Sequence, residues 1–69
     1  MHVLMMINTD NPELKWNAVR FGNVLLNAGD DVTLFLNGPG ADLYNGDSEA
    51  FPIREQTKIF ALSEGVLLA

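Results

Sequence analysis

The 69-residue sequence contains no cysteine, one histidine and only four basic residues. Without cysteine, the chain itself cannot form disulfides, thiolate zinc sites, iron–sulfur clusters or a thiol nucleophile. The single imidazole, that of His2, cannot build a metal site alone, so we expect neither a metal nor a cofactor on this chain. Nine acidic residues against four basic ones give a net charge of −5. The chain therefore lacks the clustered cations with which proteins bind nucleic acids and anionic membrane surfaces.

No apolar run approaches the roughly 20 residues that a membrane-spanning helix needs. We therefore expect an acidic, cytoplasmic protein without a membrane segment. The hydrophobic content of 48% and the short length predict one small α/β domain over residues 1–69. A core of this size supplies roughly 3–5 kcal/mol, and no disulfide supports it. We expect such a domain to need a partner.

The first apolar segment, residues 3–7, does not alternate with polar residues. This pattern is typical of a strand that is buried on both faces of a parallel sheet. Asp10 or Asn11 can cap the helix that follows, and Pro12 suits its first position. Gly29 is the residue type that favours the position just past a helix end. The sequence therefore predicts a strand and then a helix from Pro12 to about Ala28.

The rest of the chain repeats this order. Residues 32–36 are apolar, β-branched and aromatic, which predicts a second strand. Pro52 begins a second helical pattern, Gly65 ends it, and residues 66–69 begin a third apolar strand. Strands that alternate with helices predict a parallel sheet. Because the sequence stops inside the third strand, we expect Ala69 to be either a truncation point or a terminus that another subunit completes.

The two helices differ in their apolar surfaces. In the second, Ile53, Thr57 and Phe60 share one inward stripe. In the first, one stripe contains Leu14, Ala18, Phe21, Leu25 and Ala28, and Val19, Gly22 and Leu26 extend it. The resulting arc of roughly 180° exceeds the roughly 100° of a helix that packs on one side only. We therefore expect the first helix, with Trp16 on its polar side, to contact a loop or another subunit as well as the sheet.

Ligands of open parallel sheets bind at the carboxyl ends of the strands. Asn8 and Asp10 follow the first strand, and Asn37 and Gly38 follow the second, so these four residues are the candidate binding residues of one crevice. The helix that begins at Pro12 presents backbone N–H groups that can hold an anion. The competing interpretation is that Asn8 and Asp10 only cap the helix and close the turn. No glycine-rich phosphate-binding motif is present, and no serine has a histidine partner that the sequence supports.

Three segments of the chain resemble the opening of DsrE/DsrF-like proteins, which are small α/β proteins of sulfur-relay type. They are residues 5–13 (MMINTDNPE), 16–18 (WNA) and 28–40 (AGDDVTLFLNGPG), and the similarity continues to residues 64–69. The resemblance implies a three-layer parallel sheet with helices on both sides and a β-α-β-α-β order, here incomplete at the C-terminus. It also implies assembly into homo-oligomers, as trimers or hexamers, and contact with other sulfur-relay proteins. In sulfur-transferring members it implies a persulfide-carrying cysteine at the end of the third strand.

This sequence departs from the family at that cysteine. It contains none and stops at Ala69, where the cysteine would follow, so no catalytic residue is carried over and the chain as given is not expected to be an enzyme. Intracellular sulfur relay in the complete form is the function that the resemblance implies. The alternative is a non-enzymatic, oligomeric module that binds a small ligand or anion near Asn8, Asp10 and Asn37. A scaffold protein with a merely solvated loop at 42–49 is the third interpretation.

Overall fold

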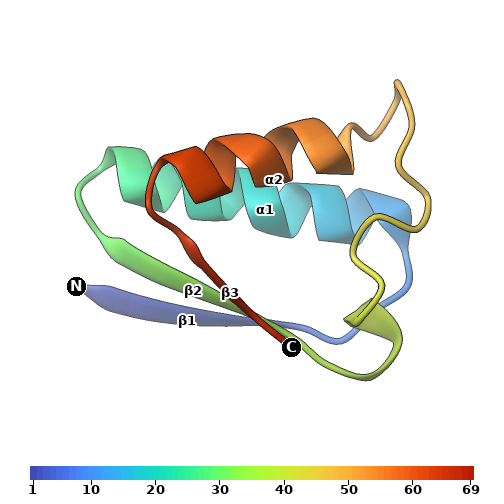
Figure 1. Cartoon of the computed structure of the whole chain (residues 1–69), viewed down its shortest axis with the longest axis horizontal. Coiled ribbons are helices and arrows are strands. Elements are labelled where there is room, and N and C mark those ends of the chain that lie inside the picture. The colour runs from blue at the N-terminus through green and yellow to red at the C-terminus, as the bar shows by residue number, and fades with distance from the viewer.

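The computed structural model describes all residues, 1–69, as three strands, two α-helices and one short 3-10 turn (Figure 1). In chain order the elements are β1 (His2–Ile7), α1 (Pro12–Asn27), β2 (Asp31–Leu36), η1 (Gly38–Gly40), α2 (Ile53–Leu62) and β3 (Val66–Leu68). The structure confirms a small α/β domain with a parallel three-stranded sheet and two helices. Neither helix has the length and hydrophobicity that a bilayer crossing requires.

The sheet has β2 at its centre, between β1 and β3, and all strands run in the same direction. The pairing of β1 with β2 extends over six residues, from His2 opposite Asp31 to Ile7 opposite Leu36. The pairing of β3 with β2 is half as long and ends with Leu68 opposite Phe35. The carboxyl ends of all three strands therefore lie at one edge of the sheet.

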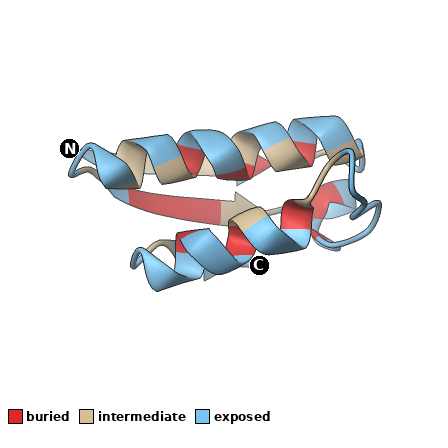
Figure 2. Cartoon of the chain, turned by 90° about the horizontal axis from the view of Figure 1, so that it is seen from above, coloured by how far each residue is buried: buried red, intermediate tan, exposed pale blue.

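Both helices lie on the same face of the sheet, side by side, so the chain forms two layers (Figures 1 and 2). The expectation of three layers, with helices on both sides, is wrong for these residues. The reason is the strand order: β1, β2 and β3 are added in one direction, and consecutive right-handed crossovers in one direction place their helices on one side. A helix on the other face requires a reversal of direction, which these three strands do not make.

The structure at the start of α1 shows which of the two candidate residues, Asp10 or Asn11, caps the helix. Asn11 is the N-cap, because its side-chain oxygen accepts a hydrogen bond from the Leu14 amide at 3.1 Å. Pro12 is the first helical residue, as expected, and the helix ends before Gly29, whose φ is +95°. Asp10 does not cap the helix and makes a different contact.

The buried side of α1 is rotated from the predicted main stripe. Its buried residues are Lys15, Val19 and Gly22, whereas Leu14 and Phe21 are 56% and 54% exposed. The close approach of the two helices explains the rotation. A Cβ atom at Gly22 would lie 3.1 Å from the ring of Phe60, which is a tight contact, so a glycine favours the close approach of α2. The helix therefore turns its glycine side inward and leaves Leu14 and Phe21 at the flank.

The stripe predicted for α2 is confirmed. Ile53, Thr57 and Phe60 are the buried residues of this helix, and the Thr57 hydroxyl donates to the Ile53 carbonyl at 2.8 Å, which satisfies its polar group. The seven buried apolar residues form one cluster between the sheet and the helices: Ile7, Val19, Val32, Leu34, Leu43, Ile53 and Phe60. Figure 2 shows buried residues on the facing sides of the two helices and on the sheet behind them, and exposed residues on the outer sides of the helices.

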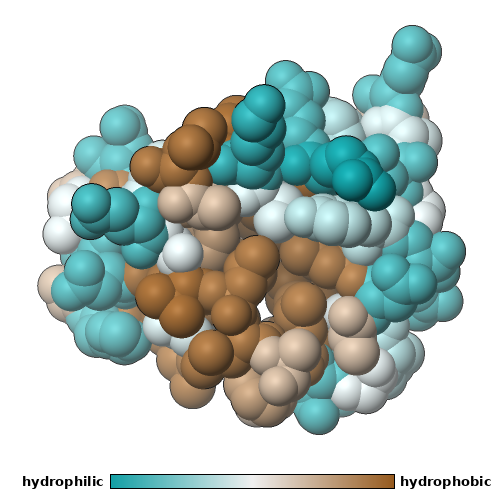
Figure 3. Space-filling model, viewed as in Figure 1, coloured by the Kyte–Doolittle hydropathy of each residue, from teal (hydrophilic) through white to brown (hydrophobic).

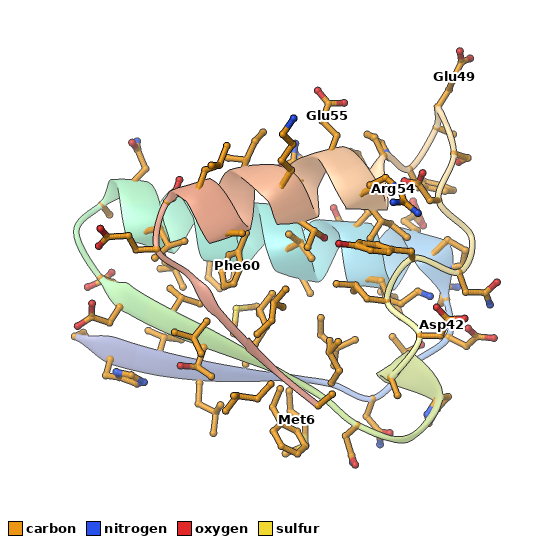
Figure 4. All side chains as sticks on the ribbon, viewed as in Figure 1. Met6, Asp42, Glu49, Arg54, Glu55 and Phe60 are labelled. Carbon is orange, nitrogen blue, oxygen red and sulfur yellow. The ribbon has the colours of Figure 1, made fainter.

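The face of the sheet away from the helices is open and apolar. The pairing register aligns Leu4, Thr33 and Val66 in one row, and Met6, Phe35 and Leu68 in the next. On this open sheet face Leu4 and Met6 are 62% and 61% exposed, and Val66 and Leu68 are 47% and 50% exposed. Met6 points away from the helices in Figure 4, and Figure 3 shows apolar atoms gathered over the sheet. The prediction that the first strand is buried on both faces is therefore wrong.

Candidate functional site

The four candidate residues lie in the loops that directly follow the carboxyl ends of β1 and β2. The amide of Asn37 donates to the carbonyl of Ile7 at 2.9 Å, which extends the ladder by one bond. The side-chain oxygen of Asn8 lies against Gly38, 2.7 Å from where a Cβ atom would stand. Gly38 has a φ of +52°, so a side chain there would be both crowded and strained. The structure thus brings Asn8, Asn37 and Gly38 together at one edge.

Asp10 turns away from this group toward the loop between η1 and α2. Its Oδ1 atom accepts a hydrogen bond from the side-chain amide of Asn45 at 3.0 Å. The same oxygen lies 3.7 Å from the ammonium nitrogen of Lys15. Asp10 therefore fastens a loop that is distant in sequence, and its carboxylate is 61% exposed.

Lys15 is the residue at this edge that the sequence analysis missed. Its side chain is completely buried, and its ammonium donates to the backbone carbonyls of Asp42 at 3.0 Å and Asn45 at 2.6 Å. We call the group Lys15, Asp10, Asp42 and Asn45 the Lys15 cluster. A lysine with its charge out of water needs such partners. The cluster connects α1, the segment after β1 and the 41–47 loop.

A signal for Lys15 was present in the sequence. It precedes Val19 by four residues and Gly22 by seven, so it lies within the stripe that faces inward. A basic residue in an apolar stripe is the sign of a buried, partnered charge. The signal was hidden because Leu14 and Phe21 form an equally regular stripe on the neighbouring side.

The start of α1 is a poor site for an anion. The Asn11 side chain already occupies the Leu14 amide, and the Thr9 hydroxyl accepts from the amide of Asn11 at 3.1 Å. The carboxylate of Asp10 lies next to these groups and repels a second negative charge. What the edge offers to a ligand is the pair of exposed carboxamides, Asn8 and Asn37.

The glycine-rich segment after β2 has a steric role. Gly40 is buried, and a Cβ atom there would overlap the backbone carbonyl of Ile7. The turn η1 therefore passes directly against the end of β1. Replacing Gly40 by any other residue would push this turn away from the strand end.

The remaining singled-out residues do not form a reaction centre. His2 is exposed at the amino end of β1, with its Nε2 atom 3.4 Å from the Thr33 hydroxyl. Trp16 packs on Phe51, with 5.7 Å between ring centroids, which is a contact with the loop before α2. The Ser48 hydroxyl accepts from the Phe51 amide at 3.1 Å. No three or more His, Asp or Glu side chains gather as metal ligands would.

Comparisons with known proteins add no assignment to this geometry. No protein-family model matches the chain, and no curated protein or solved structure matches it significantly.

Proposed function

We propose that this chain is a DsrE/DsrF-like framework for intracellular sulfur relay, in which residues outside these 69 supply the sulfur-carrying thiol. The proposal rests on the sequence resemblance of residues 5–13 and 28–40 and on one structural observation. Three parallel strands bring their carboxyl ends to one edge of the sheet, in the order β1, β2, β3. The chain itself has no cysteine, so it supplies the frame of such a site and not its nucleophile.

The surroundings of this edge suit an anionic sulfur species. Leu68 lies opposite Phe35, so the carboxyl end of β3 emerges beside the residues that lead into Asn37. The exposed carboxamides of Asn37 and Asn8 carry N–H donors, and a thiolate or persulfide anion accepts such bonds. The Lys15 cluster holds the adjoining loop in place without presenting its charge to solvent. The proposed contribution of this chain is thus orientation and hydrogen bonding.

The proposal is tested by looking for the sulfur species. We expect that the tagged chain, isolated without oxygen from cells treated with sulfide in air and alkylated at once, is accompanied by a persulfide on a cysteine. Oxygen during the treatment is the two-electron oxidant that converts sulfide to the sulfane sulfur of a persulfide. That cysteine should belong to a segment continuous with the chain or to a polypeptide in stoichiometric complex with it. The nucleotide sequence after the codon for Ala69 shows which of the two applies. Mass spectrometry that finds no persulfide at any sulfide concentration would remove the sulfur function.

A double substitution supplies the control for the role of the edge. Asn8→Ala together with Asn37→Ala removes both carboxamides and should lower the persulfide yield. Asn17→Ala together with Asn27→Ala removes two exposed carboxamides from α1 and should leave the yield unchanged. Equal yields in all three proteins would contradict the proposed hydrogen bonding.

The second candidate is a non-enzymatic, oligomeric module, and the open sheet face favours its oligomeric part. Large apolar side chains gathered on one surface of a small protein mark an interaction site. Leu4, Met6, Val66 and Leu68 are each about half exposed or more on this face. We propose that the chain forms homo-oligomers through this surface. This candidate needs no sulfur chemistry.

A substitution that introduces a charge tests self-association through the open sheet face. We expect Met6→Lys to raise the dissociation constant of the homo-oligomer by about tenfold to a hundredfold, because one buried apolar side chain contributes roughly 1.5–3 kcal/mol. Leu62→Lys is the matched control, since Leu62 is 76% exposed on α2 and lies away from this face. Analytical ultracentrifugation over a concentration series measures both. An unchanged dissociation constant in Met6→Lys would exclude this face as the contact.

A further inference from the structure

A groove runs along the side of α1 that faces away from its buried residues. It is shallow and broadly open to solvent, with a volume of about 510 Å³. Six of the lining residues belong to α1 and one to α2: Asn17, Arg20, Phe21, Asn23, Val24, Asn27 and Gln56. We call it the α1 groove. It is separate from the strand ends where Asn8 and Asn37 lie.

The charge of the α1 groove differs from that of the rest of the chain. Nine of the 69 residues are acidic, yet none of them lines the groove, and Arg20 is its only charged residue. The second hollow of the surface provides the contrast. Arg54 and Lys58 lie there with three carboxylates, those of Asp47, Glu49 and Glu55, and Figure 4 shows Glu49, Arg54 and Glu55 at the same end of the molecule. An anion is therefore attracted to Arg20 and repelled from the surroundings of Arg54.

Arg20 is held in position before any ligand arrives. Its guanidinium carbon stands 4.2 Å from the centroid of the Trp16 ring, and its Nη1 atom donates to the side-chain oxygen of Asn17 at 3.0 Å. It forms no ion pair within the chain, whose ion pairs involve other residues. A guanidinium has five N–H donors, so most remain available to a planar carboxylate. Preorganisation of this kind lowers the entropic cost of binding.

The amide groups beside Arg20 include one free donor group, and the buried Oδ1 atom of Asn23 has no hydrogen-bond partner. Asn23 donates through Nδ2 to both the backbone oxygen and the side-chain oxygen of Gln56, at 3.0 and 2.9 Å. The side-chain oxygen of Gln56 is thereby occupied, and its NH₂ group remains as a donor. Phe21 and Val24, which are 54% and 63% exposed, add an apolar wall to the same groove.

We propose that the α1 groove binds a small organic carboxylate, whose charged end pairs with Arg20 and whose hydrocarbon part packs on Phe21 and Val24. Oxygen atoms of the ligand accept from the guanidinium and from the Gln56 amide. The apolar wall distinguishes such a ligand from inorganic phosphate, which offers it no surface. This binding site is independent of the sulfur-relay proposal and of the open sheet face.

Trp16 is the only tryptophan and lies under Arg20, so its fluorescence reports on the groove. The probe is benzoate, with benzamide as its neutral counterpart and inorganic phosphate as a charged ligand without an apolar part. We expect a saturable fluorescence change with benzoate. Binding of benzamide should be at least about tenfold weaker, because it lacks the charge that strengthens hydrogen bonds to Arg20. Phosphate should also bind at least about tenfold more weakly, because it has no hydrocarbon part to pack on Phe21 and Val24.

Two arginine variants locate the site. Arg20→Gln should weaken benzoate binding by about tenfold to a hundredfold, measured by calorimetry because the variant also changes the surroundings of Trp16. Arg54→Gln should leave the affinity unchanged, although Arg54 likewise lies over an aromatic ring, that of Tyr44, at 4.5 Å. Circular dichroism checks that both variants fold. The absence of saturation, equal binding of benzamide or phosphate, or an equal loss in Arg54→Gln would overturn the proposal.

Discussion

Replacing Lys15 with alanine should destabilise the domain by about 3–5 kcal/mol, because a buried acceptor without a donor costs about 1–3 kcal/mol and the lost side chain leaves a cavity. The substitution leaves the carbonyls of Asp42 and Asn45 without their donor. It also empties the space of a side chain that is completely buried. Because the core of a domain this small supplies roughly 3–5 kcal/mol in total, most of the Lys15→Ala protein should be unfolded at 25 °C. Urea denaturation followed by circular dichroism measures the loss.

Two further variants separate the charge of Lys15 from its volume. Lys15→Met keeps an unbranched side chain in the same space and removes the ammonium, so it should cost about 2–3 kcal/mol, close to that of hydrogen bonds to a charged group. Lys58→Ala removes an exposed lysine from α2 and should change the stability by less than about 0.5 kcal/mol. Hydrogen exchange in Lys15→Met should show faster exchange in the 41–47 loop. A Lys15→Ala protein as stable as Lys58→Ala would show that the cluster contributes nothing to folding.

Replacing Phe60 with alanine should cost about 3–5 kcal/mol, the usual range for a large aromatic residue in a core. Phe60 is completely buried, and its ring lies against the backbone of Gly22 in α1 and of Gly65 before β3. One side chain thus connects α2 to its neighbouring helix and to the strand that follows. Because β3 pairs with β2 over only three residues, we expect its amide protons to lose protection first.

The control for Phe60 is on the same helix. Leu62→Ala removes a side chain that is 76% exposed and should change the stability by about 0.5 kcal/mol or less. The opposite change, Gly65→Ala, places a methyl group into the Phe60 ring and should destabilise the same junction by about 1–3 kcal/mol. Thermal melts of the three variants at one protein concentration rank their effects on stability. A Phe60→Ala melt that coincides with that of Leu62→Ala would contradict the role of this ring.

Much of the fold follows from local patterns in the sequence. Pro12 and the residues around Gly29 delimit α1 because caps and turns depend on neighbours in the chain. The buried stripe of α2 was predicted because Ile53, Thr57 and Phe60 are its only regular inward set. The α/β class follows from the alternation of apolar strands with helical patterns.

The features that the sequence did not reveal depend on contacts between distant segments. The layer number depends on the direction in which strands are added, and periodicity alone does not reveal that direction. Asp10 was predicted to lie in the crevice, but its main partner, Asn45, is 35 residues further along the chain. Lys15 was overlooked for the same reason, since its acceptors are backbone carbonyls, which every residue has. Sequence reasoning thus located the edge of the sheet but not the loop that is fastened to it.

The arrangement of both helices on one side leaves the opposite face of the sheet without a covering layer, so that Leu4, Met6, Val66 and Leu68 are exposed there. Folding is therefore coupled to binding, because any partner that covers this hydrophobic surface also stabilises the folded chain. A free energy of unfolding that is measured at one protein concentration then contains contributions from both folding and association. Substitutions of Leu4 or Leu68 change association as well as the stability of the monomer. Substitutions of Lys15 or Phe60 change only the stability of the folded interior.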